Sequence, residues 1–136
     1  MNLDDFQKIE PIYNLEFDDF WKPQNLKSEL QNVSSKYIVA KENGEIVGFA
    51  GIWYSVDDAH ITNIVVRKNY RNKGIGSLLL EKLIELAKTK ASLTLEVNTK
   101  NEIAQKLYLK YGFKNLGIRK KYYDGIEDAY IMTLYF

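Results

Sequence analysis

Residues 71–76 read Arg-Asn-Lys-Gly-Ile-Gly, between an apolar, β-branched run at 61–66 and a stretch of helical periodicity that begins at Ile75. Two glycines this close together let the backbone turn sharply and approach a ligand. The helix that follows would present unpaired N–H groups and the positive end of its dipole to that ligand. The arrangement predicts an anion-binding loop, with added charge from Arg71 and Lys73.

The two most familiar phosphate motifs do not fit this loop. A mononucleotide loop requires GxxxxGK followed by Ser or Thr, and a dinucleotide-binding turn requires a third glycine where Leu79 stands. The pattern that fits is RxxGxG after a strand, which resembles the loop that holds the pyrophosphate of acetyl-CoA in the GNAT acetyltransferase superfamily. The resemblance implies that acetyl-CoA is the cosubstrate and that no metal is needed.

Composition limits the other possibilities. With 136 residues and 46% hydrophobic content, the chain suits one domain over residues 1–136, since typical domains have about 100–150 residues. A formal net charge of +1 offers no general field for nucleic acid or anionic lipid. The absence of cysteine excludes disulfides, thiolate metal sites and a cysteine acyl-enzyme, so acyl transfer is expected to be direct.

The N-terminal sequence and the hydropathy of the chain indicate where the protein is located. The N-terminus is acidic and lacks an apolar signal core, and no run of about 18 apolar residues occurs anywhere. We therefore expect a soluble, cytoplasmic protein, a monomer or weak dimer, without a membrane or nucleic-acid partner.

Local patterns predict the order of helices and strands. An acidic cap at Asp4 or Asp5 and Pro23 in a first turn indicate two helices near the N-terminus, and Asn43-Gly44 is a strong hairpin signal. Helices are expected at about 4–17, 23–32, 75–87 and 102–110, and strands at about 36–42, 45–55, 61–66, 93–97, 114–119 and 128–134.

Further pieces of sequence extend the resemblance to the GNAT core. In the expected order and spacing come Leu95-Glu96-Val97, Asn101, Leu107-Tyr108 and Tyr111-Gly112-Phe113. The resemblance implies an α/β GNAT fold, with a mixed, mostly antiparallel central sheet of about six to seven strands flanked by about four helices. One departure is Asn98, because the family usually has an arginine directly after Leu-Glu-Val.

The C-terminal part of the sequence narrows the resemblance to one group of enzymes within the superfamily. Residues 117–123, followed by Glu127-Asp128-Ala129 and Met132, are similar to the C-terminal signature of the ribosomal-protein-alanine N-acetyltransferases and related protein N-terminal acetyltransferases. This resemblance implies that the acceptor is the α-amine of a protein N-terminus, namely the alanine terminus of ribosomal protein S18.

Glu96 is the candidate base. It lies in the apolar run 93–97, whose composition predicts a buried strand, and a buried carboxylate is costly unless it is paired or its pKa is raised. The resemblance implies that it accepts the proton of the incoming amine through an ordered water. From strand position alone, a glutamate that faces solvent or forms a salt bridge also fits.

Tyr108 is the candidate acid. It falls on the apolar face of the predicted helix at 102–110, where the ring can pack while the hydroxyl reaches outward. The resemblance gives this position the role of proton donor to the coenzyme sulfur. An ordinary phenol has a pKa about 1.5 units above that of a thiol, so transfer in water is uphill by about 2 kcal/mol. The alternative is a tyrosine that only fills the core.

Coenzyme binding is expected from the strand before the loop and from the loop itself. Backbone groups of residues 64–66 should bind the pantetheine arm as an added strand would, with one N–H polarising the thioester carbonyl. Asn101 is a further contact by resemblance, although a plain helix cap also explains it. The residues predicted to bind acetyl-CoA are Ile64, Val65, Val66, Arg71, Asn72, Lys73, Gly74, Ile75, Gly76, Ser77 and Asn101.

Residues 119–123 are expected to form a basic and aromatic connection between the last two strands, which in the family overhangs the first residues of the peptide. Tyr122 and Tyr123 are the predicted substrate-binding residues, as walls of a pocket for a small side chain. A solvated hairpin surface is the alternative. His60 has no second ligand at metal spacing, so a structural role is expected rather than a metal site.

These features predict an enzyme that transfers acetyl directly from acetyl-CoA to a protein N-terminal α-amine. The residues alone lead to an anion-binding loop, a buried acid and a phenol, a set that suits group transfer from a phosphorylated coenzyme. Two alternatives remain: a GNAT enzyme that acetylates lysine, a polyamine or another small amine, and a regulatory module that binds coenzyme A without catalysis.

Overall fold

The computed structural model describes residues 1–17, 23–123, 125 and 127–136. Its strands are β1 (Ser35–Glu42), β2 (Glu45–Tyr54), β3 (Asp58–Val66), β4 (Ser92–Asn98), β5 (Lys114–Tyr123) and β6 (Glu127–Tyr135). Its helices are α1 (Leu3–Ile9), α2 (Pro23–Leu30), α3 (Ile75–Ala87) and α4 (Glu102–Lys110), with short helical turns η1 (Glu10–Ile12), η2 (Tyr13–Phe17) and η3 (Lys68–Tyr70). Among these helices, none is long and apolar enough to cross a membrane.

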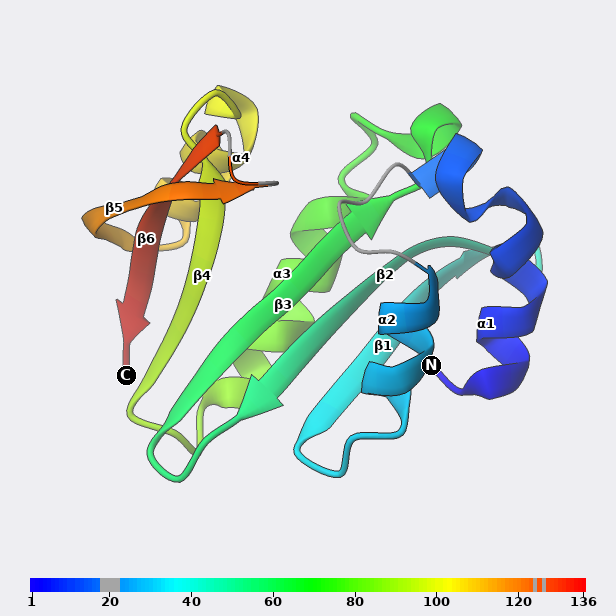
Figure 1. Ribbon diagram of the computed structural model, residues 1–136, viewed down its shortest axis with the longest axis horizontal. Helices are drawn as coiled ribbons and strands as arrows, with labels where there is room; N and C mark the ends of the chain where they lie inside the picture. Colours follow the sequence, from blue (N-terminus) through cyan, green and yellow to red (C-terminus); the bar gives the residue numbers. More distant parts are fainter. Residues whose placement is uncertain (18–22, 124, 126) are drawn as a thin grey trace.

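The six strands form one mixed sheet in the order β1-β2-β3-β4-β6-β5, and only the β3–β4 pair is parallel. Helix α3 lies behind β2 and β3, while α1 and α2 lie on the front of the sheet (Figure 1). This arrangement confirms the predicted α/β fold with a mostly antiparallel sheet and four flanking helices.

Each face of the sheet has its own hydrophobic core. Leu79, Leu80 and Leu83 of α3 are buried mainly against β2 and β3 because apolar residues recur on one face of the helix. On the other face, Phe17 of η2 packs on Phe49 of β2, with ring centroids 5.6 Å apart. The second core ties the N-terminal segment to the sheet, so that η2 reaches the end of β3.

The cap of the first helix differs from the prediction. Asn2, rather than Asp4 or Asp5, is the N-cap: its Oδ1 accepts a hydrogen bond from the backbone N–H of Asp5 at 2.9 Å. The Asp5 carboxylate in turn accepts from the N–H of Asn2 at 3.0 Å. This reciprocal capping box satisfies two otherwise unpaired donors, which a single acidic cap would not do. Helix α2 does begin at Pro23, as predicted.

The hairpin at Asn43-Gly44 is confirmed. Glu42 pairs with Glu45 across a two-residue turn, and Asn43 and Gly44 have φ angles of 52° and 81°. Two left-handed residues are what such a turn requires, because its twist must match that of the flanking strands.

Strands β3 and β4 run side by side only at one end. Their parallel pairing covers Asp58 to His60 on β3, after which the strands part (Figure 1). Strand β3 begins three residues before the predicted Ile61, because it already pairs with β4 at Asp58, whose carboxylate accepts from the Ser92 hydroxyl at 2.7 Å. A bulge at Thr62 interrupts the ladder to β2. Beyond the bulge, the β4 side of residues 64–66 has no strand partner among the strands that the structure describes.

The sequence predicts that the basic and aromatic segment 119–123 connects the last two strands. In the structure this segment instead belongs to β5. The strand continues because Arg119 still pairs with Ala129 and Tyr123 pairs with Glu127. Between these pairs the register is irregular, and Lys121 has a φ of 51°. Charged side chains therefore project from an edge strand beside β6.

Candidate active site

The predicted anion-binding loop joins β3 to α3 through η3. Gly74 is the N-cap of α3 and has a φ of 84°, in the left-handed region where a side chain causes strain. A Cβ at Gly74 would meet no protein atom within 4 Å, and a Cβ at Gly76 would meet only Val66 at 3.9 Å. The two glycines therefore provide the bend and leave open space beside the first turn of α3, which suits a phosphate.

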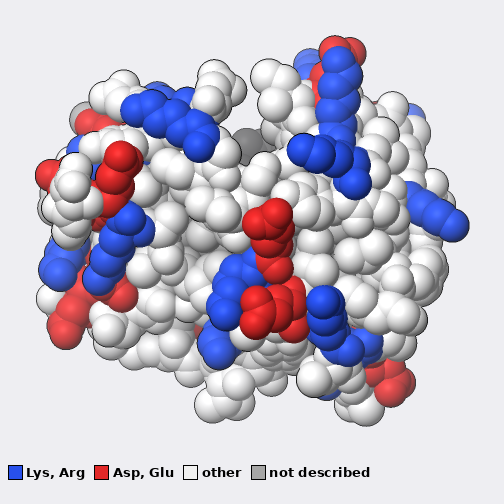
Figure 2. All heavy atoms as spheres, turned by 180° about the vertical axis from the view of Figure 1, so that it is seen from behind, with Lys and Arg blue, Asp and Glu red and all other residues white. Residues whose placement is uncertain are grey.

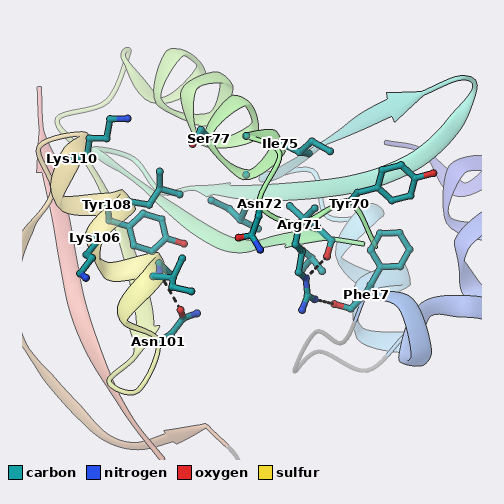
Figure 3. A pocket seen from close by; sticks show the side chains of 18 residues that line it. Phe17, Tyr70, Arg71, Asn72, Ile75, Ser77, Asn101, Lys106, Tyr108 and Lys110 are labelled. Atoms are coloured by element: carbon teal, nitrogen blue, oxygen red, sulfur yellow. Dashed lines mark hydrogen bonds between the residues drawn. The ribbon is translucent and has the colours of Figure 1, made fainter. Parts of the chain in front are cut away.

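The two basic residues of the loop are already engaged within the protein. The Arg71 guanidinium donates from Nε to the carbonyl of Val66 at 2.9 Å and from an Nη to the carbonyl of Phe17 at 3.1 Å (Figure 3). Lys73 lies over the ring of Tyr70, with Nζ 5.3 Å from the centroid. Arg71 thus joins the loop to the end of η2 as well as lining the adjacent cavity.

A cavity of about 810 Å³ opens beside the loop. Its size is in the usual range for small-molecule sites, about 300–1,000 Å³. All the residues predicted to bind coenzyme line it except Lys73. The lining residues are Phe17, Ile64, Val65, Val66, Tyr70, Arg71, Asn72, Gly74, Ile75, Gly76, Ser77, Asn101, Ile103, Ala104, Lys106, Leu107, Tyr108 and Lys110.

Helix α4 forms the opposite wall and adds charge that the sequence reasoning missed. Lys106 and Lys110, one turn apart, line the cavity across from Arg71, and Lys and Arg side chains stand on both sides of the hollow in the upper part of Figure 2. The sequence signal that could have identified these lysines is their position two residues before and two residues after Tyr108. Asn101 lines the cavity and also caps α4, since its Oδ1 accepts from the N–H of Ala104 at 3.1 Å.

Tyr108 places its hydroxyl in the cavity (Figure 3). Its ring packs on Phe113 with centroids 5.8 Å apart, and the hydroxyl has no hydrogen-bond partner among the described residues. Although one side of the ring lines the cavity, protein atoms surround the phenol, and this burial raises the pKa of Tyr108 to about 12. The phenol therefore stays protonated and can donate to a ligand atom.

Glu96 lies on β4 just past the point where β3 and β4 part, outside the lining of the cavity. Its Oε2 contacts Nε2 of His60, and its Oε1 accepts from Arg119 at 3.0 Å. Burial raises the pKa of this carboxyl, but the hydrogen bond and charge of His60, followed by those of Arg119, more than offset that effect, so the pKa lies below its usual value. Glu96 is thus a paired and ionised carboxylate.

Of the predicted substrate-binding pair, Tyr122 lies near this carboxylate, and the side chain of Tyr123 lies outside the described residues. The Arg119 guanidinium sits over the Tyr122 ring, 4.9 Å from its centroid. Burial raises the pKa of Tyr122, and the negative charge of Glu96 raises it further. Strand β5 therefore brings a cation and an aromatic ring beside Glu96.

Asn98, the position at which the family usually has arginine, ties β4 to β6. Its side-chain amide donates to the carboxylate of Glu127, and its Oδ1 accepts from the N–H of Lys100 at 2.9 Å. The ammonium of Lys100 is 3.7 Å from the same Glu127 carboxylate. Asn98, Lys100 and Glu127 therefore form a polar network at the end of β4, beyond the splay, which is the point where β3 and β4 part. Strand β4 contributes no guanidinium to this network.

The arrangement defines an enzyme that transfers a group from a phosphorylated coenzyme: a glycine loop at a helix start, an open strand edge, and an ionised carboxylate beyond the splay. Within the described residues no cluster of three His, Cys, Asp or Glu side chains suits a metal. The Acetyltransferase (GNAT) family matches residues 6–113, and the chain belongs to this family.

Relatives and solved structures agree with this assignment. A Haemophilus influenzae protein named as a ribosomal protein bS18-alanine N-acetyltransferase is 37% identical over 93% of this chain and 92% of its own. The crystal structure of the Escherichia coli ribosomal-protein-S18-alanine N-acetyltransferase superposes with a TM-score of 0.88 at 32% identity, covering 99% of this chain and 90% of that one. A GNAT acetyltransferase from Elizabethkingia anophelis with acetyl-CoA bound gives 0.74 at 28% identity, covering 85% and 84%.

Replacing Gly74 with alanine is expected to raise the Kd for acetyl-CoA about tenfold and to lower the free energy of unfolding by about 1 kcal/mol, because the left-handed N-cap is strained by any side chain. Calorimetry and denaturant unfolding measure the two effects. Gly44→Ala is the matched control, since its φ of 81° carries the same strain in a distant hairpin. Gly44→Ala should lower the free energy of unfolding and leave the Kd for acetyl-CoA unchanged. A wild-type Kd in Gly74→Ala would contradict the role of the loop.

Proposed function

We propose that this protein acetylates the N-terminal α-amine of a protein, with acetyl-CoA as the donor, and that the acceptor is the alanine terminus of ribosomal protein S18. The observation that carries the proposal is an ionised carboxylate, Glu96, at the point where β3 and β4 part, on a strand pair whose open edge at residues 64–66 lines a cavity with an anion-binding loop. The names of the relatives that match nearly the whole chain support the acceptor.

The residues of the cavity fit acetyl-CoA, which supplies an activated acetyl thioester when bound. The first turn of α3 and the cations Arg71, Lys106 and Lys110 suit the diphosphate. Residues 64–66 leave a strand edge beside the cavity, which suits the amides of a pantetheine arm. An N–H of the same edge can donate to the carbonyl oxygen and stabilise negative charge as the amine attacks.

Glu96 and Tyr108 have complementary roles in this proposal. Glu96, held ionised by His60 and Arg119, attracts the ammonium group of the peptide and accepts its proton, so that the nitrogen can attack. Tyr108 keeps its proton at neutral pH and donates a hydrogen bond to the sulfur as the C–S bond breaks. Tyr122, packed under Arg119, walls the position of the first side chain.

The free-energy cost of deprotonating the amine favours an α-amine as the acceptor. At pH 7, neutralising a peptide α-amine with a pKa near 7.8 costs about 1.1 kcal/mol, whereas a lysine with a pKa near 10.4 costs about 4.6 kcal/mol. Glu96 has a lowered pKa and is a weak base. The site is therefore better matched to an α-amine than to a lysine side chain.

A comparison of acceptors tests the proposal. Three are offered with acetyl-CoA: a peptide that carries the first residues of S18, an N-terminally blocked peptide with an internal lysine, and spermidine. We expect kcat/KM for the alanine peptide to exceed the other two by at least about 10², as expected from the difference in amine pKa. Equal or faster acetylation of lysine or spermidine would overturn the acceptor. Binding of acetyl-CoA in calorimetry without turnover of any amine would instead indicate a non-catalytic module.

A further inference from the structure

The bulge in β3 decides which way the backbone beyond it faces. Before the bulge, Ile61 packs on the α3 side of the sheet. After it, Ile64 and Val66 pack on that side and Val65 packs on the other. The extra residue, Thr62, therefore inverts the alternation, because the side chains and backbone groups of a strand change direction at every residue. Without the bulge, the backbone groups that face the open edge of β3 would turn toward β2.

A chain of hydrogen bonds holds this bulge. The Thr62 hydroxyl donates its single proton to Oδ1 of Asn63 at 3.0 Å. The Thr62 oxygen also lies 3.0 Å from the Tyr37 hydroxyl, so Tyr37 is the donor in that contact. Tyr37 and Asn63 are each only 5% exposed, and a hydrogen bond is stronger in such an environment than in water. The chain of hydrogen bonds thus ties the bulge of β3 to β1, across β2.

Gly51 of β2 leaves the room that these hydrogen bonds need. It is paired with Tyr37 on one side and with Asn63 on the other. A Cβ at Gly51 would collide with the Tyr37 ring and lie 2.5 Å from the Thr62 oxygen. The Tyr37 ring therefore crosses β2 above a residue without a side chain and reaches the bulge directly. Bulges and aromatic rings that cover a glycine are both devices that fix the register of a strand.

We propose that Tyr37, Thr62 and Asn63 are positioning residues that hold the backbone of residues 64–66 in the orientation that binds the pantetheine arm. This role rests on the proposed function, in which the arm lies along that edge. The three side chains act through the backbone, since none of them lines the cavity. The anion-binding loop comes after the end of β3, so a shift of the bulge should weaken contacts to the arm and spare those to the diphosphate.

Thr62→Val tests this role, because valine keeps the shape of threonine and lacks the hydroxyl. Calorimetry compares acetyl-CoA with adenosine 3′-phosphate 5′-diphosphate, the part of the coenzyme without the pantetheine arm. We expect the Kd for acetyl-CoA to rise about fivefold, equivalent to the loss of one hydrogen bond. The Kd for the adenosine fragment should stay at its wild-type value. Thr62→Ser restores the hydroxyl and should restore the Kd for acetyl-CoA.

Thr133→Val is the matched control. The Thr133 hydroxyl lies 2.9 Å from that of Thr94 on the same face of the sheet, and Thr133 is buried. The variant loses a comparable hydrogen bond away from the bulge, so both Kd values should match those of the wild type. Denaturant unfolding measures the stability of both valine variants. A loss of stability in Thr62→Val with an unchanged Kd for acetyl-CoA would overturn the positioning role.

A double-mutant cycle with a milder variant shows whether the hydroxyls act as one unit. Tyr37→Phe removes the outer donor and keeps the ring over Gly51, so it should raise the Kd for acetyl-CoA about twofold. Tyr37→Phe combined with Thr62→Val should bind acetyl-CoA as tightly as Thr62→Val alone, since the bond between the two hydroxyls is already lost. Strictly additive effects on the Kd would contradict a connected chain of hydrogen bonds.

The outcomes separate the positioning role from the proposed function. An equal rise of both Kd values in Thr62→Val would mean a general loosening of the site and would overturn the role alone. A wild-type protein that binds acetyl-CoA but acetylates no amine would overturn the proposed function and leave the binding results intact. A wild-type protein that binds the adenosine fragment as tightly as acetyl-CoA would overturn the placement of the arm, and this role with it.

Discussion

Glu96→Gln lowers kcat for the alanine peptide by about 10²–10⁴-fold, the usual contribution of a positioned acid–base residue. The amide has nearly the shape of the carboxylate but cannot take a proton, and it no longer offers a negative charge to Arg119. Binding of acetyl-CoA should change little, because Glu96 does not line the cavity. Steady-state kinetics and calorimetry measure the two quantities.

A surface glutamate provides the control for this variant. Glu85 lies on the exposed face of α3, in an ion pair with Lys82 at 3.6 Å. Such pairs contribute little to stability, usually about 0–1 kcal/mol, so Glu85→Gln should keep the wild-type kcat. If Glu96→Gln also keeps the wild-type kcat, the carboxylate forms a structural salt bridge and is not the base.

Tyr108→Phe is expected to lower kcat by about 10–10²-fold while the Kd for acetyl-CoA stays within about twofold of wild type, because a lost hydrogen bond to a charged atom costs about 1.5–3 kcal/mol. With a pKa of about 12, full transfer of the phenol proton to a thiolate is uphill by about 5 kcal/mol. The hydroxyl therefore acts as a hydrogen-bond donor to the leaving sulfur. For an ordinary phenol in water the same proton transfer costs only about 2 kcal/mol, and the burial of Tyr108 accounts for the difference.

Tyr111 provides the matched control for the loss of a phenol hydroxyl. It follows α4 directly, and its hydroxyl donates to Glu81 at 2.8 Å on the surface. Tyr111→Phe should retain wild-type kcat. Rapid-quench measurement of a single turnover separates the chemical step from product release. An unchanged single-turnover rate in Tyr108→Phe would show that the residue only packs against Phe113.

The elements that were predicted well depend on local chemistry. The turn at Asn43-Gly44 needs two left-handed residues, and few other sequences supply them. Helix α3 follows from the spacing of Leu79 and Leu83 and from the bend at Gly74. The family pattern around the loop extends this local information to the position of the adjacent cavity, which nearly all the residues predicted to bind coenzyme line.

The features that were missed depend on residues distant in sequence. The contact between His60 and Glu96 spans 36 positions, and it exists because β3 and β4 are parallel neighbours for three residues before they part. The continuation of β5 to Tyr123 depends on pairing with Glu127 of β6. No pattern within either segment predicts these partners, so His60 looked isolated and 119–123 looked like a loop.

Local backbone preferences and apolar periodicity in the chain were enough to predict the α/β order, the hairpin and the loop at the start of α3, and the resemblance of its ordered motifs to the GNAT core was enough to predict the family. Packing established the rest. The divergence of β3 and β4, the joining of Arg71 to Phe17, and the pairing that keeps Glu96 ionised all require side chains from separate strands to meet. Burial and charge act through space, so the pKa of a residue is set by neighbours that its sequence context does not name.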